Sequence, residues 1–362
     1  MLLMSALLIV LTLGLGYANG ANDVSKGIAT LVGSGVTEYR RAVLWGTGWT
    51  IAGGVLAGLL VSGMVATFSG QALLASAPAG GSLPVAVACG AIGWLVVATL
   101  TGLPVSTTHA LLGGLCGAGI AAQGISGVLW GAVGWRAALP LAVSPVLSLA
   151  LMAVLFPLIR TGYRRFERYC VCLERQELVS VGPAGAAAMA TSRALTVIAG
   201  ADCPPQVVSR VNLLDSLHWF SAGLTSLFRG LNDAPKILAL GVAAAAATGI
   251  SQPSQYVLIA VAMGAGSYLA GARVTGTLAA KVTRMRPGEG FAANLVTSLL
   301  VASASGLALP VSTTHVSSSA IIGLGLHNRD VRWRTVSEML LAWLITIPVA
   351  GSIAWLAYSM VA

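Results

Sequence analysis

The sequence predicts an all-α membrane protein, a polytopic helical bundle built from two repeats of inverted topology. We expect half-helices or re-entrant segments of the two repeats to meet near the midplane of the membrane. Three observations support this prediction: the composition is very apolar, two motifs occur twice in the same order, and the basic residues gather in a few loops.

The composition requires a lipid environment. Of the 362 residues, 56% are hydrophobic and 9% are charged, and the mean hydropathy is +0.86. A soluble domain carries about 25% charged residues, so this chain could not cover itself with a polar surface. We therefore predict a multi-pass protein of the inner (plasma) membrane, with the lipid bilayer as its solvent. The net charge of +9 comes from loop arginines and lysines and indicates no nucleic-acid partner.

An internal duplication divides the chain. The sequence GANDVSK at 20–26 matches GLNDAPK at 230–236, and PVSTTH at 104–109 recurs unchanged at 310–315. The offsets of 210 and 206 residues keep the order and nearly the spacing of the two motifs. We therefore predict a first transmembrane repeat at 1–160, a cytoplasmic loop at 161–210 and a second transmembrane repeat at 211–362.

The charges predict how the two repeats are oriented. Basic loops occur at 40–41, 160–210, 273–286 and 329–334. The segments equivalent to 40–41, 273–286 and 329–334 in the other half lie near 250, 65–80 and 123–128, and they are uncharged. Cytoplasmic loops of membrane proteins carry the excess of Lys and Arg, so the basic loops are expected in the cytoplasm and their equivalents on the other side. The halves should then have opposite topology, as in many secondary transporters.

Apolar runs give the expected helices. Long runs occur at 2–18, 41–63, 84–101, 138–159, 211–228, 255–272, 290–308 and 337–360. Shorter runs, each opened by a repeated motif, occur at 22–35, 105–122, 233–249 and 311–326. A crossing needs about 20 residues, so we expect the shorter runs to be half-helices or re-entrant segments. Residues 84–122 begin and end beside non-basic loops, which predicts a hairpin.

The PVSTTH motif has the composition of a helix start. Pro favours the first turn of a helix, and Ser or Thr favours the N-cap. Free backbone N–H groups and the helix dipole attract anions there, and neutral hydroxyls add donors. We therefore expect a tetrahedral oxyanion to bind among Ser106, Thr107, Thr108, Ser312, Thr313 and Thr314. The plainer alternative is that these residues only cap broken helices.

The Asn-Asp pairs place carboxylates inside the membrane, where ionisable residues are costly and usually functional. Asn22 and Asp23 form the first pair, and Asn232 and Asp233 form the second. Their oxygens suit a coupling cation such as Na⁺, and the carboxylates suit a proton. The alternative is that each Asp caps a buried helix. We expect no cofactor, and no metal beyond Na⁺ at these motifs.

Two lysines accompany these carboxylates. Lys26 and Lys236 each follow their Asp by three residues and so share its helical face. Each lysine is expected to neutralise its Asp or to contact the anion, and the alternative is snorkelling to the lipid headgroups.

Several other polar residues have open roles. His109 and His315 are either protonatable coupling groups or packed neutral side chains. Arg229, Asp215 and His218 have uncharged equivalents in the first half, so they either create asymmetry or form structural ion pairs.

The loop cysteines give a weak metal signal. Cys170 and Cys172 are followed by the distant Cys203, with no His in the loop, whereas structural zinc prefers four ligands at closer spacing. Ordinary reduced thiols are the expected state.

These motifs resemble those of the inorganic phosphate transporter (PiT) family. The resemblance rests on Gly-Ala-Asn-Asp at 20–23, its repeat at 232–233 and both Ser-Thr-Thr elements, and it covers the chain outside the central loop. It implies a symporter that carries inorganic phosphate with H⁺ or Na⁺, with these residues around the substrate and the coupling ion. Some relatives carry sulfate, so a sulfate or other oxyanion permease is the alternative.

One departure from the family concerns the coupling ion. Many members have Asn where this chain has Lys26, and both copies here read Asn-Asp-x-x-Lys. A fixed ammonium beside each carboxylate repels a bound cation. We therefore expect less dependence on Na⁺ than in the Asn-bearing relatives, and coupling to protons.

Two other functional classes are weaker. Paired half-helices can also line an anion channel, but paired Asp and Lys favour binding with alternating access. A membrane enzyme would need a nucleophile–base set or a metal cluster, and the Ser-His spacing of the motif suits capping better, so we predict no enzyme. The assembly state, including a homodimer, stays open.

Overall fold

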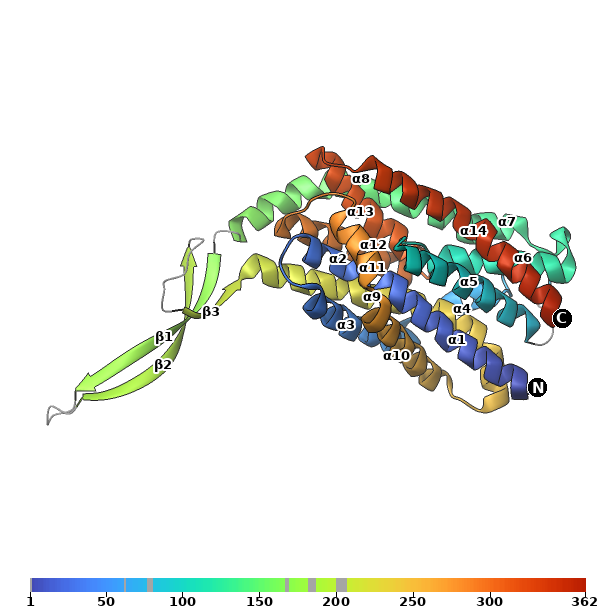
Figure 1. Cartoon of the computed structure of the whole chain (residues 1–362), viewed down its shortest axis with the longest axis horizontal. Coiled ribbons are helices and arrows are strands. Elements are labelled where there is room, and N and C mark those ends of the chain that lie inside the picture. The colour runs from blue at the N-terminus through green and yellow to red at the C-terminus, as the bar shows by residue number, and fades with distance from the viewer. Residues whose placement is uncertain (1, 62, 77–80, 167–168, 182–186, 200–206) are drawn as a thin grey trace.

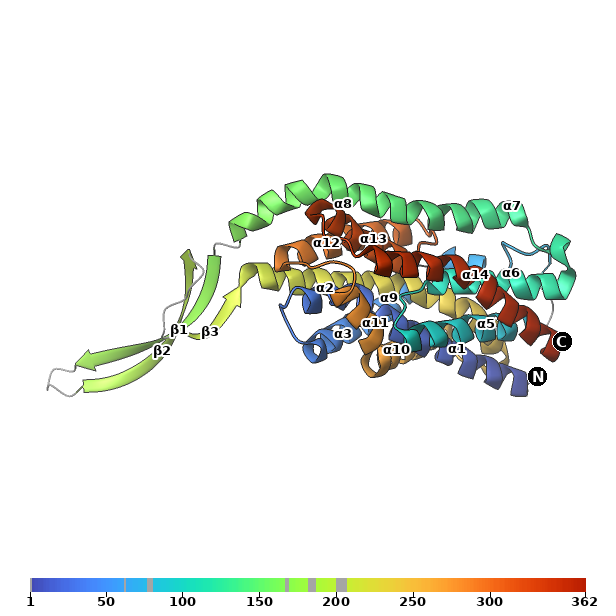
Figure 2. The same ribbon diagram turned by 45° about the horizontal axis from the view of Figure 1, so that its top comes forward.

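The protein is a bundle of long helices with a small sheet extending from one end (Figures 1 and 2). The computed structural model describes the chain except residues 1, 62, 77–80, 167–168, 182–186 and 200–206. It gives the backbone without side chains at residue 2 and in the remaining parts of 165–212 and 243–248.

The helices follow the apolar runs of the sequence. The first half contains α1 (Leu2–Asp23), α2 (Ser25–Gly33), α3 (Tyr39–Leu60), α4 (Gly63–Phe68), α5 (Ser82–Thr101), α6 (Thr107–Gln123), α7 (Trp130–Ala132) and α8 (Leu139–Phe166). The second half contains α9 (Leu213–Thr248), α10 (Gln252–Ala270), α11 (Ala272–Ala280), α12 (Pro287–Gly306), α13 (Thr313–Asn328) and α14 (Trp333–Val361). A 3₁₀ turn at Ile125–Gly127 and a π-helical turn at Val133–Ala138 precede α8. The predicted helical fold is confirmed.

Several of these segments are long and apolar enough to cross a membrane. Among the described residues there are 5 such segments, or up to 6 if the bent pair α10–α11 forms one span. The five are Leu3–Gly33, Tyr39–Leu60, Ser82–Thr101, Trp130–Arg164 and Trp333–Val361. α10 and α11 meet at an angle of 67°. The protein is therefore a multi-pass membrane protein.

The repeated motifs behave in two different ways. α6 and α13 begin within PVSTTH, as predicted, and α5 packs against α6 in the predicted hairpin. The Asn-Asp copies do not open half-helices, and this expectation is wrong. The first copy ends α1, which continues into α2 after the single helical residue Val24. The second copy lies inside the continuous α9, which includes Pro235 within its length. Glycines near both motifs, and Pro235 in the second, suggested a break, but both motifs are buried and the helices continue through them.

The two halves pack according to the duplication. The contact of α1 with α10 corresponds to the contact of α9 with α3 in the other half. In the same way, α14 covers α5 and α6, and its equivalent α8 covers α12 and α13. Equivalent glycines form the closest contacts. A Cβ on Gly20 or Gly266 would overlap a backbone oxygen across the α1–α10 contact, and one on Gly230 or Gly53 would do so across the α9–α3 contact. Small residues allow helix backbones to approach closely in membranes.

Gly53→Ala should therefore separate α3 from α9 and destabilise the protein. The added Cβ would overlap the backbone oxygen of Leu227, which cannot rotate away. We expect a loss of about 1–3 kcal/mol, seen as a lower melting temperature of the detergent-solubilised protein. Gly48→Ala, on the same helix with open space at the Cβ, is the control. Equal melting temperatures for the two variants would contradict the close contact.

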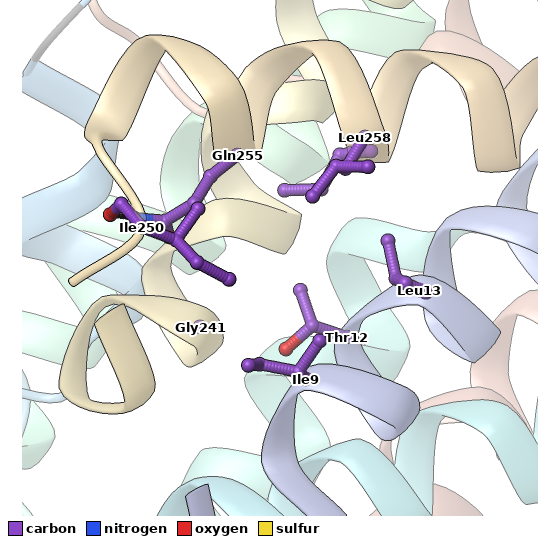
Figure 3. A pocket seen from close by; sticks show the side chains of 8 residues that line it. Ile9, Thr12, Leu13, Gly241, Ile250, Gln255 and Leu258 are labelled. Carbon is purple, nitrogen blue, oxygen red and sulfur yellow. Dashed lines mark hydrogen bonds between the residues drawn. The ribbon is translucent and has the colours of Figure 1, made fainter. Parts of the chain in front are cut away.

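α1 and α9, which carry equivalent motifs, run in opposite directions. His218, near the start of α9, hydrogen-bonds through its Nε2 to Thr30 Oγ1 in α2, at a distance of 3.1 Å. The start of α1 instead meets the end of α9, where Ile9 and Thr12 face Gly241 and Ile250 across a small, mostly apolar pocket (Figure 3). This antiparallel arrangement is what the inverted-repeat prediction requires.

The basic segments gather at the end of the bundle that carries the sheet. Gly33, just before the 40–41 loop, lies against Ala279. Arg332 donates to the carbonyl of Ala280 at 2.5 Å, and the backbone N–H of Arg284 donates to Asp330 at 3.2 Å. Residues 74–76 and 123–128, which belong to the uncharged equivalents, touch one another: the Ala75 N–H donates to the Gly127 carbonyl at 2.9 Å. All four basic segments therefore share one end (Figure 2).

The segment between the halves, predicted as a loop, contains three strands. They are β1 (Tyr169–Val181), β2 (Ala187–Ala199) and β3 (Val207–Asn212), in the order β2-β1-β3. β1 pairs antiparallel with both neighbours, from Tyr169↔Ala199 to Val181↔Ala187 with β2, and with a register shift between Leu173 and Glu174 against β3. The strands extend away from the bundle (Figure 1). These strands were not predicted from the sequence.

Candidate functional site

The two helix starts and the two Asn-Asp motifs meet in the middle of the bundle. α1 and α2 supply one Asn-Asp-x-x-Lys motif, the middle of α9 supplies the other, and α6 and α13 bring their first turns between them. All predicted site residues are buried, with none more than 4% exposed. They are Asn22, Asp23, Lys26, Ser106, Thr107, Thr108, Asn232, Asp233, Lys236, Ser312, Thr313 and Thr314.

The Ser-Thr-Thr motifs form true helix starts that also bind each other. Ser106 Oγ accepts the N–H of His109, and Ser312 Oγ accepts the N–H of His315, both at 3.2 Å. Each motif then donates to the segment before the other helix. Thr108 Oγ1 donates to the Val311 carbonyl at 3.3 Å, and Thr314 Oγ1 donates to the Val105 carbonyl at 2.7 Å. The two positive helix ends are therefore held side by side.

The asparagines fix the loops before these helices. Asn22 accepts the N–H of Val105 at 3.1 Å and donates to the carbonyl of Leu103 at 3.0 Å. Asn232 donates to the Val311 carbonyl at 3.4 Å and accepts from Ser305 at the same distance. Each amide thus links an Asn-Asp motif to the Ser-Thr-Thr start of its own half. The two asparagines therefore position the helix starts, and their contact with a coupling cation stays a prediction.

Each carboxylate is paired with the lysine of its own motif. Lys26 contacts Asp23 directly, and Lys236 Nζ lies 3.2 Å from Asp233. Lys236 Nζ also donates to Thr108 Oγ1 at 2.9 Å and to the Val311 carbonyl at 3.0 Å. Lys236 therefore joins the second Asn-Asp motif to both helix starts. Neither lysine reaches the lipid headgroups, which excludes the snorkelling alternative.

Asn19 and Arg229 connect the two halves at the centre. Asn19 Nδ2 donates to Asp23 at 3.1 Å and to Asp233 at 3.2 Å, so one amide bridges both carboxylates. It also lies 3.0 Å from Thr107 Oγ1. Arg229 donates to Asn19 Oδ1 at 3.3 Å. From the sequence, the role of Arg229 was open and Asn19 had no predicted role. Asn19 and Arg229 occupy equivalent positions, one helical turn before the Asp of each motif. This equivalence is the sequence signal that could have identified them as site residues.

The central charges leave an excess of positive charge. Two carboxylates, Asp23 and Asp233, face three buried cations, Lys26, Lys236 and Arg229. Arg229 also donates to Thr50 at 2.5 Å, and its Nε has no hydrogen-bond partner in the part of the chain that the structure describes. A buried charge is costly unless it is paired, so this excess favours an anion at the centre.

The two histidines pack behind the helix starts. Their rings lie 4.4 Å apart, and His315 stacks on Trp343 of α14 at 4.0 Å. His109 Nδ1 lies 2.8 Å from Ser106 Oγ. Both rings line a mostly apolar pocket of about 560 Å³ between α6, α13, α8 and α14. This packing agrees with the packed alternative of the sequence analysis.

The described residues contain no group of three or more His, Cys, Asp or Glu side chains arranged to hold a metal. The side chains of Cys170 and Cys172, and all of Cys203, lie outside the described residues.

The comparisons with known proteins agree with this geometry. A model of the phosphate transporter family matches residues 19–354. The chain is 30% identical to a Mycobacterium bovis protein named "Probable low-affinity inorganic phosphate transporter", over 98% of this chain and 77% of that protein. It is 28% identical to a Rhizobium meliloti protein of the same name, over 97% of this chain and 94% of that protein.

A solved structure shares the fold. "The sodium-dependent phosphate transporter" superposes with a TM-score of 0.75 at 20% identity, covering 99% of this chain and 98% of that chain. At this identity the likeness concerns the fold alone. The match of the family model over residues 19–354 shows that this chain belongs to the phosphate transporter family.

Proposed function

We propose that this protein is a symporter that accumulates inorganic phosphate, with the anion bound between the first turns of α6 and α13. Membership of a transporter family makes it a transport protein and not an enzyme. The observation that carries the proposal is the central site itself. Two helix N-termini, the threonine hydroxyls of both Ser-Thr-Thr motifs and three buried cations lie together in the middle of the bundle, where the cations outnumber the carboxylates. These are the donors that a tetrahedral oxyanion uses.

We further propose that protons drive uptake. The carboxylates that would bind a coupling Na⁺ are each already in contact with an ammonium group. A sodium ion there would lie beside a fixed positive charge and lose affinity. A proton, in contrast, can be carried by an Asp–Lys pair without displacing either group.

Uptake of labelled phosphate by purified protein in liposomes tests both parts. An inward proton gradient without Na⁺ should drive accumulation above equilibrium, which a channel cannot achieve. Uptake that requires Na⁺ at fixed pH and ignores the proton gradient would contradict the coupling. The same assay identifies the anion: unlabelled arsenate should compete strongly and sulfate weakly, and the reverse order would favour a sulfate permease.

The orientation of the bundle follows from its charged end. We propose that the sheet and the four basic segments lie in the cytoplasm, because they share one end of the bundle. The equivalent helices α1 and α9 then cross the plasma membrane in opposite directions, as inverted repeats do.

A further inference from the structure

The interior of the bundle differs between its two ends. Toward the sheet, the space between α2, α9 and α12 is filled by buried polar side chains, which we call the polar seam: Thr30, His218, Thr225, Asn294 and Ser298. The equivalent positions in the other half, at the offsets of 210 and 206 residues, are Leu240, Leu8, Leu15, Ala88 and Ile92. All five are apolar; Leu15, Ala88 and Leu240 belong to one hydrophobic cluster, and Ile92 packs against it. The duplication has therefore diverged to a polar set on one side only.

The polar seam is a connected network across three helices. Asn294 of α12 donates to Thr30 of α2 at 2.8 Å, and Thr30 also lies 3.1 Å from His218 of α9. Thr225 of α9 donates to the Asn294 carbonyl at 3.1 Å and lies 2.9 Å from Ser298. His218 is fully buried, and its Nδ1 has no hydrogen-bond partner among the described residues. A buried polar atom without a partner is rare in a purely structural network.

The seam joins the central site to the charged end of the bundle. At its inner end, Asn294 also donates to the carbonyl of Gly27, the residue after Lys26, at 3.2 Å. At its outer end, Gly290 packs against the ring of His218. The preceding turn of α12 carries Arg286 and Glu289, which line a pocket of about 400 Å³ together with Arg160 and Arg284. Polar groups therefore continue from the buried lysine to an arginine-rich opening.

We propose that the polar seam is the passage by which the anion moves between the central site and the sheet-bearing side. The inference rests on the proposed phosphate transport. An anion that leaves the helix starts must replace its lost donors, and passing apolar side chains would cost several kcal/mol per missing hydrogen bond. Hydroxyl, amide and imidazole groups supply neutral donors that bind weakly enough to release. The seam is closed in this structure, and transport requires α12 to separate from α2 and α9.

Thr225→Val tests the passage, because valine keeps the shape and removes the hydroxyl. Thr346→Val is the matched control: Thr346 is equally buried, bonds its own helix through Ala342, and accepts one bond from another helix, from Trp94. We expect Thr225→Val to lower the rate of phosphate uptake about tenfold relative to Thr346→Val, as for one donor lost at the barrier. Stabilisation of the purified protein by phosphate should persist in both variants. Equal uptake rates would overturn the proposal.

Chemical labelling tests the passage without relying on phosphate transport. Ser298→Cys should react with a membrane-impermeant, anionic thiol reagent applied from the sheet-bearing side, with the modified residue identified by peptide mass spectrometry. Ile92→Cys, at the equivalent position of the apolar half, should not react from either side. Phosphate should slow the labelling of Ser298→Cys. No labelling of this variant overturns the passage even if the protein transports phosphate. If Ser298→Cys is labelled but the protein moves no phosphate, the passage is retained and only the proposed substrate is wrong.

Discussion

Asp233→Asn is expected to abolish phosphate accumulation and to destabilise the protein by about 3–5 kcal/mol, because it removes one partner of a buried ion pair. Lys26, Lys236 and Arg229 would then share the single remaining carboxylate of Asp23. The loss should appear as a strongly lowered melting temperature and yield of the detergent-solubilised protein. Glu338→Gln, which breaks an exposed ion pair with Arg334, should change stability by less than about 1 kcal/mol.

A second variant separates folding from transport. Asp233→Asn combined with Lys236→Met removes both charges of the pair and restores the original excess of one positive charge. Stability should recover substantially because no unpaired charge is added to that of the unchanged protein, but transport should not, because Lys236 also joins α9 to Thr108. If the double variant accumulates phosphate normally, the pair has no part in coupling. If Asp233→Asn alone is as stable as the unchanged protein, the burial argument is wrong.

Replacing both Lys26 and Lys236 by Asn should make transport depend on Na⁺. Each ammonium that now contacts an Asp would become an amide oxygen, which is a good ligand for a hard cation. In liposomes at fixed pH, uptake by this variant should rise steeply with Na⁺, whereas the unchanged protein should not respond. The corresponding Met variant removes the charge without supplying oxygen and should gain no such response.

Sodium binding can be measured even if the Asn variant is inactive. A ligand present at 100 times its dissociation constant stabilises the folded state by about 2.7 kcal/mol. Na⁺, compared with a large cation such as choline, should therefore raise the melting temperature of the Asn variant and leave that of the Met variant unchanged. A Na⁺ response in the unchanged protein would refute the idea that the lysines replace the cation.

The sequence predicted the Ser-Thr-Thr site better than the Asn-Asp site. Capping is a local property, so Ser106 and Ser312 could be identified as N-caps from their neighbours alone. The path of the backbone through Asn22 and Asn232 is decided by packing around α1 and α9, and there the expected helix starts were wrong. The sheet was not predicted either; it is defined by backbone pairing between strands, such as that of residue 169 with residue 199.

The sequence by itself determined the membrane class, the duplication and the buried ionisable residues. These follow from composition and from exact repetition, which can be read without knowing which residues lie close together in space. Only the tertiary structure decided that Asn19 bridges both carboxylates, that Arg229 adds a third cation and that polar side chains connect α2, α9 and α12. These features arise from antiparallel packing of α1 against α9, because contacts between residues about 210 apart depend on how the helices assemble.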